Sequence, residues 1–561
     1  MRMLRNRNGK GMCMEREIEA GEIEAGEIET GEHVTGRTKE EAHRSKCPEK
    51  ELTPLEKALK ERKEYTRMSG ILLHPTSLPS RYGIGDLGKG AEDFIDFLAA
   101  SHQHLWQTLP LGPTGFGDSP YQAMSAFAGQ PYIISPDLLK EDGLLDESDL
   151  WEVPQSDPRR VDYGKAIAFK MDLLRKAYEH FCRPEMEERF LPAFEAFVER
   201  ERYWLPDYAL FMAVKEAFGG RCWLDWDADI RDRKPEAMAA YAEKEKDEIR
   251  FFEFVQFLFD RQWNRIRLLA AQKDIWIIGD IPIFMSLDCA DLWAQRNLFR
   301  LDSRGYPLEV AGVPPDYFSA TGQLWGNPLY DWAVHKETGF AWWIARIRRQ
   351  MELSDYVRID HFRAFESGWA VPYGDETAEG GKWVKGPGAA LFTALQKKLG
   401  RGLPIIAEDL GIITPRVEAL RDRFGFPGMK VLQFGFGDMN DRAHIPHMYT
   451  TTNCVCYTGT HDNETTTGWY THQPEEVKDR IRLYGNCDGG GVSLDFIRFA
   501  MASVARFALF PMQDVLQLGN EARMNTPGAP SGNWTFRYEQ GQLEGWRRDW
   551  LARYTRVFAR E

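Results

Sequence analysis

The chain has 561 residues, of which 43% are hydrophobic and 28% are charged, as in a folded protein that can bury a large core. Its formal charge of −14 does not suit a phosphate-binding surface, so we expect no nucleic acid partner. No apolar run is long enough to cross a bilayer, and the amino terminus lacks the apolar segment of an export signal. We therefore expect neither a membrane anchor nor export.

The eight cysteines are scattered, and Cys454 and Cys456 lack the spacing of the usual zinc or redox pairs. Reduced thiols and a cytoplasmic location are the expectation. The acids considered below stand among arginines and histidines without metal-ligand spacing, so we expect neither a metal nor an organic cofactor. The oligomeric state is not indicated by the sequence.

Residues 1–66 differ in composition from the rest of the chain. A five-residue repeat occupies residues 17–31, and large apolar side chains are scarce. Such a segment cannot bury enough apolar surface to offset its ordering entropy, so we expect it to be disordered, with a short helix near 54–67. Two alternatives are a tail that binds a partner and a translation start at Met68.

Residues 67–561 carry the signals of an α/β fold. Short apolar runs alternate with amphipathic helical stretches, which is typical of parallel strand-helix units. The predicted strands lie near residues 71–73, 104–110, 275–282, 356–359, 403–407, 429–435, 455–457 and 506–514. Eight such units predict a catalytic (β/α)8 TIM barrel, with a helical subdomain inserted at about 137–267 and a loop-rich insertion at about 285–350. No β-sandwich domain is predicted after the barrel.

Three predicted strands end in an acid: Asp360, Glu408 and Asp462. The carboxyl ends of barrel strands meet at one face, where barrel enzymes hold their chemistry, so we expect the three carboxylates to converge there. The alternative is that each acid caps a helix or pairs with an arginine. A run of three, two of them beside a histidine or a second acid, favours a catalytic cluster.

Two loops contain candidate ligand contacts. The glycine-rich loop 112–122 lacks the lysine and spacing of a phosphate-binding loop, and its polar side chains suit a polyhydroxylated ligand. The second loop, 312–328, is rich in Pro and Gly and has aromatic residues for which ligand contact is a better explanation than core packing. The candidates are Ser119, Tyr121 and Gln122 in the first loop and Tyr317, Phe318 and Trp325 in the second.

Several motifs together carry a family resemblance. They are Gly70–Pro79, Gly117–Gln122, Gly279–Phe284, Gly312–Pro328, Arg358–Arg363, Ala407–Gly411, Thr458–Asn463 and Gly532–Trp534. In this order they resemble the amylomaltases, which are 4-alpha-glucanotransferases of the alpha-amylase superfamily, from about residue 68 to 538. Phe116 and Ala364 depart from the family, where Tyr and Gly are frequent.

The resemblance implies a role for each matching residue. Asp360 matches the nucleophile, Glu408 the general acid/base and Asp462 the third carboxylate, which stabilises the transition state. The substrate-binding set that it implies is Ser119, Tyr121, Asp280, Tyr317, Phe318, Trp325, Asn327, Arg358, His461 and Asn533. The expected partners are 1,4-alpha-glucans and maltooligosaccharides.

The implied reaction moves a 1,4-alpha-glucan segment to the 4-hydroxyl of an acceptor, with retention, through a covalent glycosyl-enzyme. We expect Arg358 to hold Asp360 ionised, and burial beside other acids to raise the pKa of Glu408. A hydrolase with the same chemistry and a glucan-binding protein without activity remain the alternatives.

Overall fold

The structure is a computed structural model that describes residues 52–315, 319–437, 442–529, 531–543 and 545–561. Its main sheet consists of β1 (Met68–Leu72), β2 (Leu105–Gln107), β3 (Trp276–Ile281), β6 (Tyr356–Ile359), β9 (Ile405–Ala407), β10 (Gly428–Val431), β11 (Cys454–Tyr457) and β12 (Phe507–Pro511). These are the eight predicted strands.

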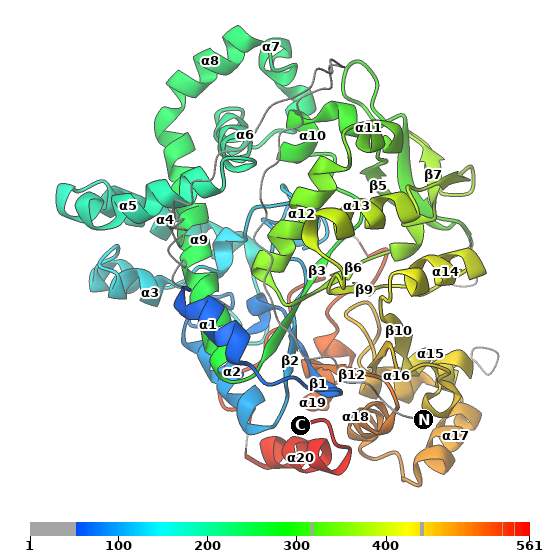
Figure 1. Ribbon diagram of the computed structural model, residues 1–561. Helices are drawn as coiled ribbons and strands as arrows, with labels where there is room; N and C mark the ends of the chain where they lie inside the picture. Colours follow the sequence, from blue (N-terminus) through cyan, green and yellow to red (C-terminus); the bar gives the residue numbers. More distant parts are fainter. Residues whose placement is uncertain (1–51, 316–318, 438–441, 530, 544) are drawn as a thin grey trace, which may run out of the picture. The chain divides into compact units, whose positions relative to one another are not determined.

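The eight strands form a nearly closed barrel. All neighbours in the order β10-β11-β12-β1-β2-β3-β6-β9 are parallel. Between the two end strands, the N–H of Ala407 donates to the carbonyl of Pro427, directly before β10, at 2.9 Å. The predicted (β/α)8 fold is confirmed (Figure 1).

Side chains alternate between the barrel interior and the surrounding helices, as the strand period of two requires. Ile278 of β3 lies in a buried cluster built from barrel strands, whereas Ile277 packs into the large cluster that includes the helices. On β6, Val357 and Ile359 face the helices. Arg358 between them is therefore directed to the interior.

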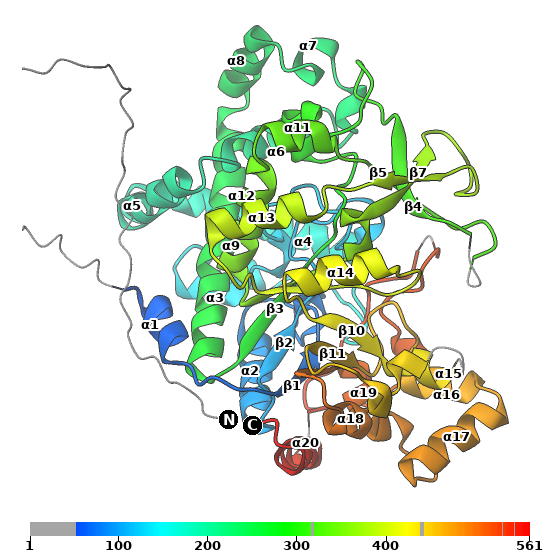
Figure 2. The same cartoon turned by 45° about the vertical axis from the view of Figure 1, so that its right-hand side comes forward.

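Helices pack around the barrel and extend from it (Figures 1 and 2). They are α1 (Pro54–Glu61), α2 (Lys89–Ala100), α3 (Pro136–Glu141), α4 (Tyr163–Phe181), α5 (Pro184–Arg200), α6 (Leu205–Ala217), α7 (Ala228–Arg231), α8 (Pro235–Lys244), α9 (Lys246–Gln272), α10 (Ala290–Ala294), α11 (Trp332–Glu337), α12 (Ala341–Leu353), α13 (Ala389–Leu399), α14 (Pro415–Arg423), α15 (Leu432–Gly437), α16 (Thr466–His472), α17 (Glu475–Gly485), α18 (Val492–Ala502), α19 (Met512–Val515) and α20 (Gly545–Val557). Short 3-10 turns connect several of them.

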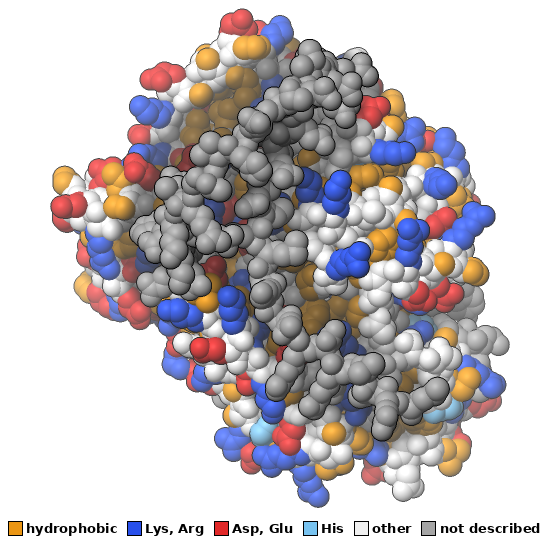
Figure 3. Space-filling view, viewed as in Figure 1, with side chains coloured by type: hydrophobic (Ala, Val, Ile, Leu, Met, Phe, Trp, Pro, Cys, Tyr) orange, Lys and Arg blue, Asp and Glu red, His pale blue; other side chains and the backbone are white. Residues whose placement is uncertain are grey.

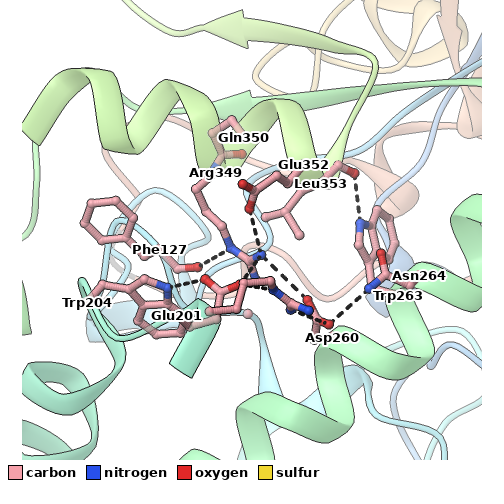
Figure 4. A network of polar contacts seen from close by, with 12 residues as sticks. Phe127, Glu201, Trp204, Asp260, Trp263, Asn264, Arg349, Gln350, Glu352 and Leu353 are labelled. Atoms are coloured by element: carbon pink, nitrogen blue, oxygen red, sulfur yellow. Dashed lines mark hydrogen bonds and ion pairs between the residues drawn. The ribbon is translucent and has the colours of Figure 1, made fainter. Parts of the chain in front are cut away.

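The stretch between β2 and β3 contains helices α3 to α9, where the sequence predicts a helical insertion. A buried ionic network joins it to α12, the helix that precedes β6 (Figure 4). Arg349 of α12 lies 3.6 Å from both Glu201 and Asp260 of the insertion and 3.3 Å from Glu352. Trp204 donates its indole N–H to Glu201 at 2.7 Å. These contacts fix the insertion to the helix leading into β6.

The predicted loop-rich stretch contains more regular structure than expected. β4 (Glu309–Val313) and β5 (Gln323–Pro328) form a four-stranded antiparallel sheet with β7 (Ser367–Pro372) and β8 (Lys382–Lys385), in the order β5-β4-β7-β8. The loop prediction for residues 323–328 was therefore wrong. Pairing with distant β7 stabilises this sheet, and the local sequence pattern does not reveal such pairing.

Two predicted strands are shorter than expected because a helix begins within each apolar run. The run 429–435 leaves the barrel after Val431, and α15 begins at Leu432 with Leu432 and Phe436 buried one turn apart. β12 ends at Pro511, which has no N–H to donate, and α19 follows.

The folded part begins earlier than the predicted boundary at residue 66. Helix α1 lies beside α9 (Figures 1 and 2). Arg62 forms a two-point ion pair with Asp355, with distances of 2.6 and 2.9 Å and side chains that are 4% and 8% exposed. Its guanidinium also stacks 3.9 Å from the ring centroid of Trp276. These buried contacts explain why residues 52–66 are ordered, and the rest of the predicted extension lies outside the described residues.

In the described part of the chain, none of the helices combines the length and the apolar character that crossing a membrane requires. On the face shown in Figure 3, acidic and basic side chains are interspersed over the described surface.

A chain that begins at Met68 is expected to be less stable than the full chain. It would leave the buried Asp355 with Arg267, 3.3 Å away, as its remaining cation, so the expected loss is below the cost of leaving a buried charge unpaired, about 3 kcal/mol. Thermal and urea unfolding of the full chain, of residues 52–561 and of residues 68–561 measures this. We expect the first two to match and the third to unfold earlier, as should Arg62→Ala. Equal stability of all three chains would contradict the proposed contribution of Arg62.

Candidate active site

The structure brings the predicted acids to the carboxyl ends of the barrel strands. Asp280 lies in β3, Asp360 follows β6, Glu408 follows β9 and Asp462 follows β11. β3, β6 and β9 are neighbours, with Asp280 opposite Arg358 and Ile359 opposite Ala407 in the register. The first three acids therefore come from adjacent strands.

Arg358 connects two of these acids. Its Nη1 lies 2.8 Å from both carboxylate oxygens of Asp280, and its Nη2 donates to Asp360 Oδ1 at 2.8 Å. Arg358 and Asp280 are 4% and 0% exposed, whereas Asp360 is 30% exposed. The arrangement leaves one side of the Asp360 carboxylate open and the rest of the ionic cluster buried.

Tyr121 completes the environment of Asp280. Its hydroxyl donates to Asp280 Oδ2 at 2.6 Å. Burial and the charge of Asp280 hold the pKa of Tyr121 well above its usual range, so the phenol keeps its proton. The Ser119 hydroxyl accepts the N–H of Tyr121 at 3.3 Å, which places Ser119 in the turn that positions this tyrosine.

Glu408 is held by two backbone donors. Its Oε2 accepts the N–H of His361 at 2.7 Å and its Oε1 the N–H of Leu410 at 3.0 Å. Burial, followed by the negative charge of Asp360, raises the pKa of Glu408 to about 8. The two N–H groups and Arg358 favour the ionised form, and burial outweighs them. An acid with a pKa of about 8 is mostly protonated at neutral pH, the state that the predicted role of Glu408 requires.

His361 has an unusual backbone for a non-glycine residue, with φ 51° and ψ 47°. This turn after β6 presents its N–H to Glu408. Burial lowers the pKa of the His361 imidazole to about 4, so the ring is neutral. The ring of Trp325, from β5, meets it edge-on at 4.8 Å between centroids. Trp325 thus lies next to the turn whose N–H holds Glu408.

Asp462 has a more exposed carboxylate, with 47% of its side chain accessible. Asn525 donates its side-chain amide to Asp462 Oδ1 at 2.6 Å, and His461 Nε2 lies 3.4 Å from the same oxygen. Arg523 donates to the main-chain oxygen of Asp462 at 2.7 Å. The ring of His461 stacks on Tyr121, with 5.1 Å between centroids.

Asn525, Arg523 and Trp534 were not predicted as site residues, although Trp534 belongs to a quoted motif. Trp534 packs against both Tyr121 and His461, at 5.8 and 5.9 Å. The first two lie in the loop after β12, where no periodicity marks them. Their only sequence signal is their place after the last barrel strand, where functional loops are found.

Two predicted contacts have their polar atoms engaged by the protein. Asn327 donates to the carbonyl of Met285 at 2.9 Å, and its Oδ1 lies 3.4 Å from the amide of Gln122. Asn533 bonds to Thr526 and Ala529 within its own loop. Both side chains shape loops beside the site. Tyr317 and Phe318 lie outside the described residues.

One group in the described part of the chain has the spacing to hold a metal ion: Asp146, Asp149 and His180. It belongs to the helical insertion, and Lys176 lies 3.9 Å from Asp149, which opposes binding of a cation. The acids of the barrel end are instead paired with Arg358, backbone N–H groups and Asn525.

Comparison with known proteins identifies the family to which this chain belongs. A family model described as 4-alpha-glucanotransferase matches residues 73–543. This chain belongs to the 4-alpha-glucanotransferase family. It is 51% identical to the 4-alpha-glucanotransferase of Synechocystis sp. over 496 residues, which cover 88% of this chain and 98% of the relative. The enzyme of the same name from Thermus thermophilus is 49% identical over 490 residues, 86% of this chain and 96% of the relative.

A solved structure supports the same family assignment. The amylomaltase from Streptococcus agalactiae in complex with acarbose superimposes with a TM-score of 0.85 at 41% identity. The match covers 88% of this chain and 99% of that chain. The family expected from the motifs is confirmed, and so is its barrel fold.

We expect kcat/KM for a natural glucan donor to fall as pH rises through about 8. Glu408 has to be protonated to donate to a leaving group, and burial raises its pKa to about 8. A pH profile with maltotriose measures this limb. With maltotriosyl fluoride, whose leaving group needs no proton, the limb should weaken. An identical limb with both donors would assign it to another group.

Proposed function

We propose that this chain transfers a 1,4-alpha-glucan segment from a donor to the 4-hydroxyl of an acceptor glucan or glucose by retaining double displacement. The observation that carries the proposal is the pairing of Asp360, which accepts a hydrogen bond from the Arg358 guanidinium, with Glu408, whose pKa is raised to about 8. A retaining mechanism requires two carboxyl groups in opposite protonation states at one pH.

In the first step, Asp360 attacks the anomeric carbon of the donor. Its ion pair with Arg358 uses Oδ1, which leaves Oδ2 to act as the nucleophile. Glu408 gives its proton to the glycosidic oxygen as that bond breaks. The product is a glycosyl ester on Asp360, a departing glucan with a free 4-hydroxyl and an ionised Glu408.

In the second step, Glu408 acts as the base. It takes the proton of the acceptor 4-hydroxyl, and the acceptor oxygen attacks the anomeric carbon and displaces Asp360. The number of glycosidic bonds is conserved, and Glu408 is protonated again. Two inversions at the same carbon give retention.

The other polar groups are assigned to binding the sugar at the cleaved bond. Asp462, held by Asn525, accepts hydroxyl groups, and His461 lies beside it. Tyr121 and Arg358 orient Asp280 at the edge of the same site. Such contacts contribute to the rate only as far as they strengthen in the transition state.

Transfer requires an acceptor hydroxyl to react before water does. Trp325, which packs on His361, is placed to stack an acceptor ring and so raise its effective concentration. Maltooligosaccharides and other 1,4-alpha-glucans are the proposed donors and acceptors. A cytoplasmic location is also part of the proposal, supported by the scattered spacing of the cysteines.

Incubation with maltotriose tests the proposed reaction. We expect glucose and a ladder of longer maltooligosaccharides, with a constant total of reducing ends, followed by chromatography and reducing-end analysis. Asp360→Asn should lower the rate by at least about 1000-fold, because it removes the nucleophile. Asp375→Asn, an exposed aspartate between β7 and β8, is the matched control and should be unchanged.

Two outcomes would contradict the proposal. Rising reducing ends without longer products would indicate a hydrolase. An Asp360→Asn variant that keeps wild-type transfer activity would remove Asp360 from the role of nucleophile.

A further inference from the structure

A small cavity lies directly beside His461, at the carboxyl ends of β1, β11 and β12. Its volume is about 20 Å³, which is enough for one water molecule. The lining is mixed, with the polar side chains of His74, Ser77, His461, Gln513 and Arg523 among apolar ones such as Leu109, Met524 and Phe536. A cavity of this size can hold a water where polar groups line it.

Two of the lining side chains have buried polar atoms that the described residues leave without a partner. These atoms are Nδ1 of His74 and Oγ of Ser77. The two residues are 2% and 0% exposed. A buried polar atom without a hydrogen bond costs about 1–3 kcal/mol, and a water that bonds to both atoms would remove that cost.

The turn after β1 fixes both groups in place. Ser77 donates its backbone N–H to the carbonyl of His74 at 2.9 Å, which closes the short 3-10 turn Pro75–Ser77. Pro75 restricts the backbone at the start of this turn. The two side chains therefore line the cavity from a hydrogen-bonded turn.

His74 is neutral near pH 7. Complete burial, with a smaller contribution from nearby His461, lowers the pKa of His74 to about 3. A neutral imidazole has one donor and one acceptor nitrogen, and its tautomer follows the hydrogen bonds on offer. His74 can thus bond a water without adding charge beside His461.

His461 is held on its other sides by residues of the active site. Its ring stacks on Tyr121 at an interplanar angle of 17° and packs against Trp534 at 38°. Its Nε2 lies 3.4 Å from Asp462 Oδ1. Stacking fixes the plane of the ring, but it does not select the ring flip or the nitrogen that carries the proton. Those two choices depend on hydrogen bonds.

We propose that His74 is a positioning residue for the transfer reaction, which with Ser77 holds a buried water that fixes the orientation and tautomer of His461 beside Asp462. The inference rests on the proposed function, because it assigns His461 to the sugar-binding groups of that site. The chemistry resembles the support of metal-bound histidines, whose outer hydrogen-bond partners contribute 10- to 100-fold to activity.

Substitution at position 74 tests the proposal. Asn places a polar atom close to the position of the histidine Nδ1, whereas Leu has a similar volume and no polar atom. We expect His74→Leu to lower kcat for maltotriose disproportionation by about 10- to 100-fold, with KM changed by less than about threefold. His74→Asn should retain most of the activity. A role in packing alone would predict the opposite ranking, because Leu preserves the buried volume better.

Serine variants provide a matched pair. Ser77→Ala should lower kcat in the same direction as His74→Leu. Ser135→Ala is the control, because Ser135 is also fully buried with an unpartnered Oγ but does not line the cavity. Thermal unfolding of each variant shows whether it is folded at the assay temperature.

A structural readout keeps the test independent of activity. A high-resolution crystal structure of the full chain should show a water within hydrogen-bond distance of His74 Nδ1 and Ser77 Oγ. Nitrogen-15 NMR of the histidines should show a change in the His461 tautomer populations in His74→Leu. A dry cavity in the wild type, or a folded His74→Leu enzyme with unchanged kcat, would overturn the proposal.

These failures differ from failure of the proposed function. If the wild-type chain does not disproportionate maltotriose, the proposed function fails. If the wild type is active and the His74 and Ser77 variants keep the same kcat, the transfer reaction stands and the positioning role is rejected.

Discussion

The candidate active site depends on one buried ionic interaction, the bridge that Arg358 makes between Asp280 and Asp360. Arginine does not lose its proton in proteins, so its charge stays fixed and holds both carboxylates in place. The same negative charge on Asp360 contributes to the raised pKa of Glu408. Burial is the larger cause of that raised pKa, and Arg358 opposes it, so the arginine at the end of β6 holds the Asp360 carboxylate in place while burial keeps Glu408 protonated.

The histidines around this bridge add little charge of their own. Burial lowers the pKa of His74 to about 3 and that of His361 to about 4. The neutral ring of His361 beside Asp360 leaves the balance between Asp360 and Glu408 undisturbed. They act through hydrogen bonds and shape: the His361 N–H holds Glu408, and its ring packs on Trp325. Charge in the site is therefore concentrated on groups that the proposed reaction uses.

The sequence predicts the barrel and its acids because their signals are local. The apolar run that ends in Asp360 or in Glu408 can be recognised from about seven consecutive residues around each acid. What it does not predict depends on contacts between distant segments. Asn525 reaches Asp462 from a loop without periodicity, β5 exists because the sheet with β4 and β7 forms, and Arg62 is ordered by Asp355. Asn327 matches a motif, yet its amide supports a loop.

The central claim is that Asp360 becomes covalently linked to the donor sugar, and trapping that intermediate tests it most directly. Glu408→Gln with maltotriosyl fluoride can complete the first step, since fluoride leaves without a proton, but lacks the base for the second. Mass spectrometry of the digested protein should place one maltotriosyl group on the peptide containing Asp360. An adduct on Asp280 or Asp462 instead, or fluoride release at full rate with no adduct at any time, would contradict the account.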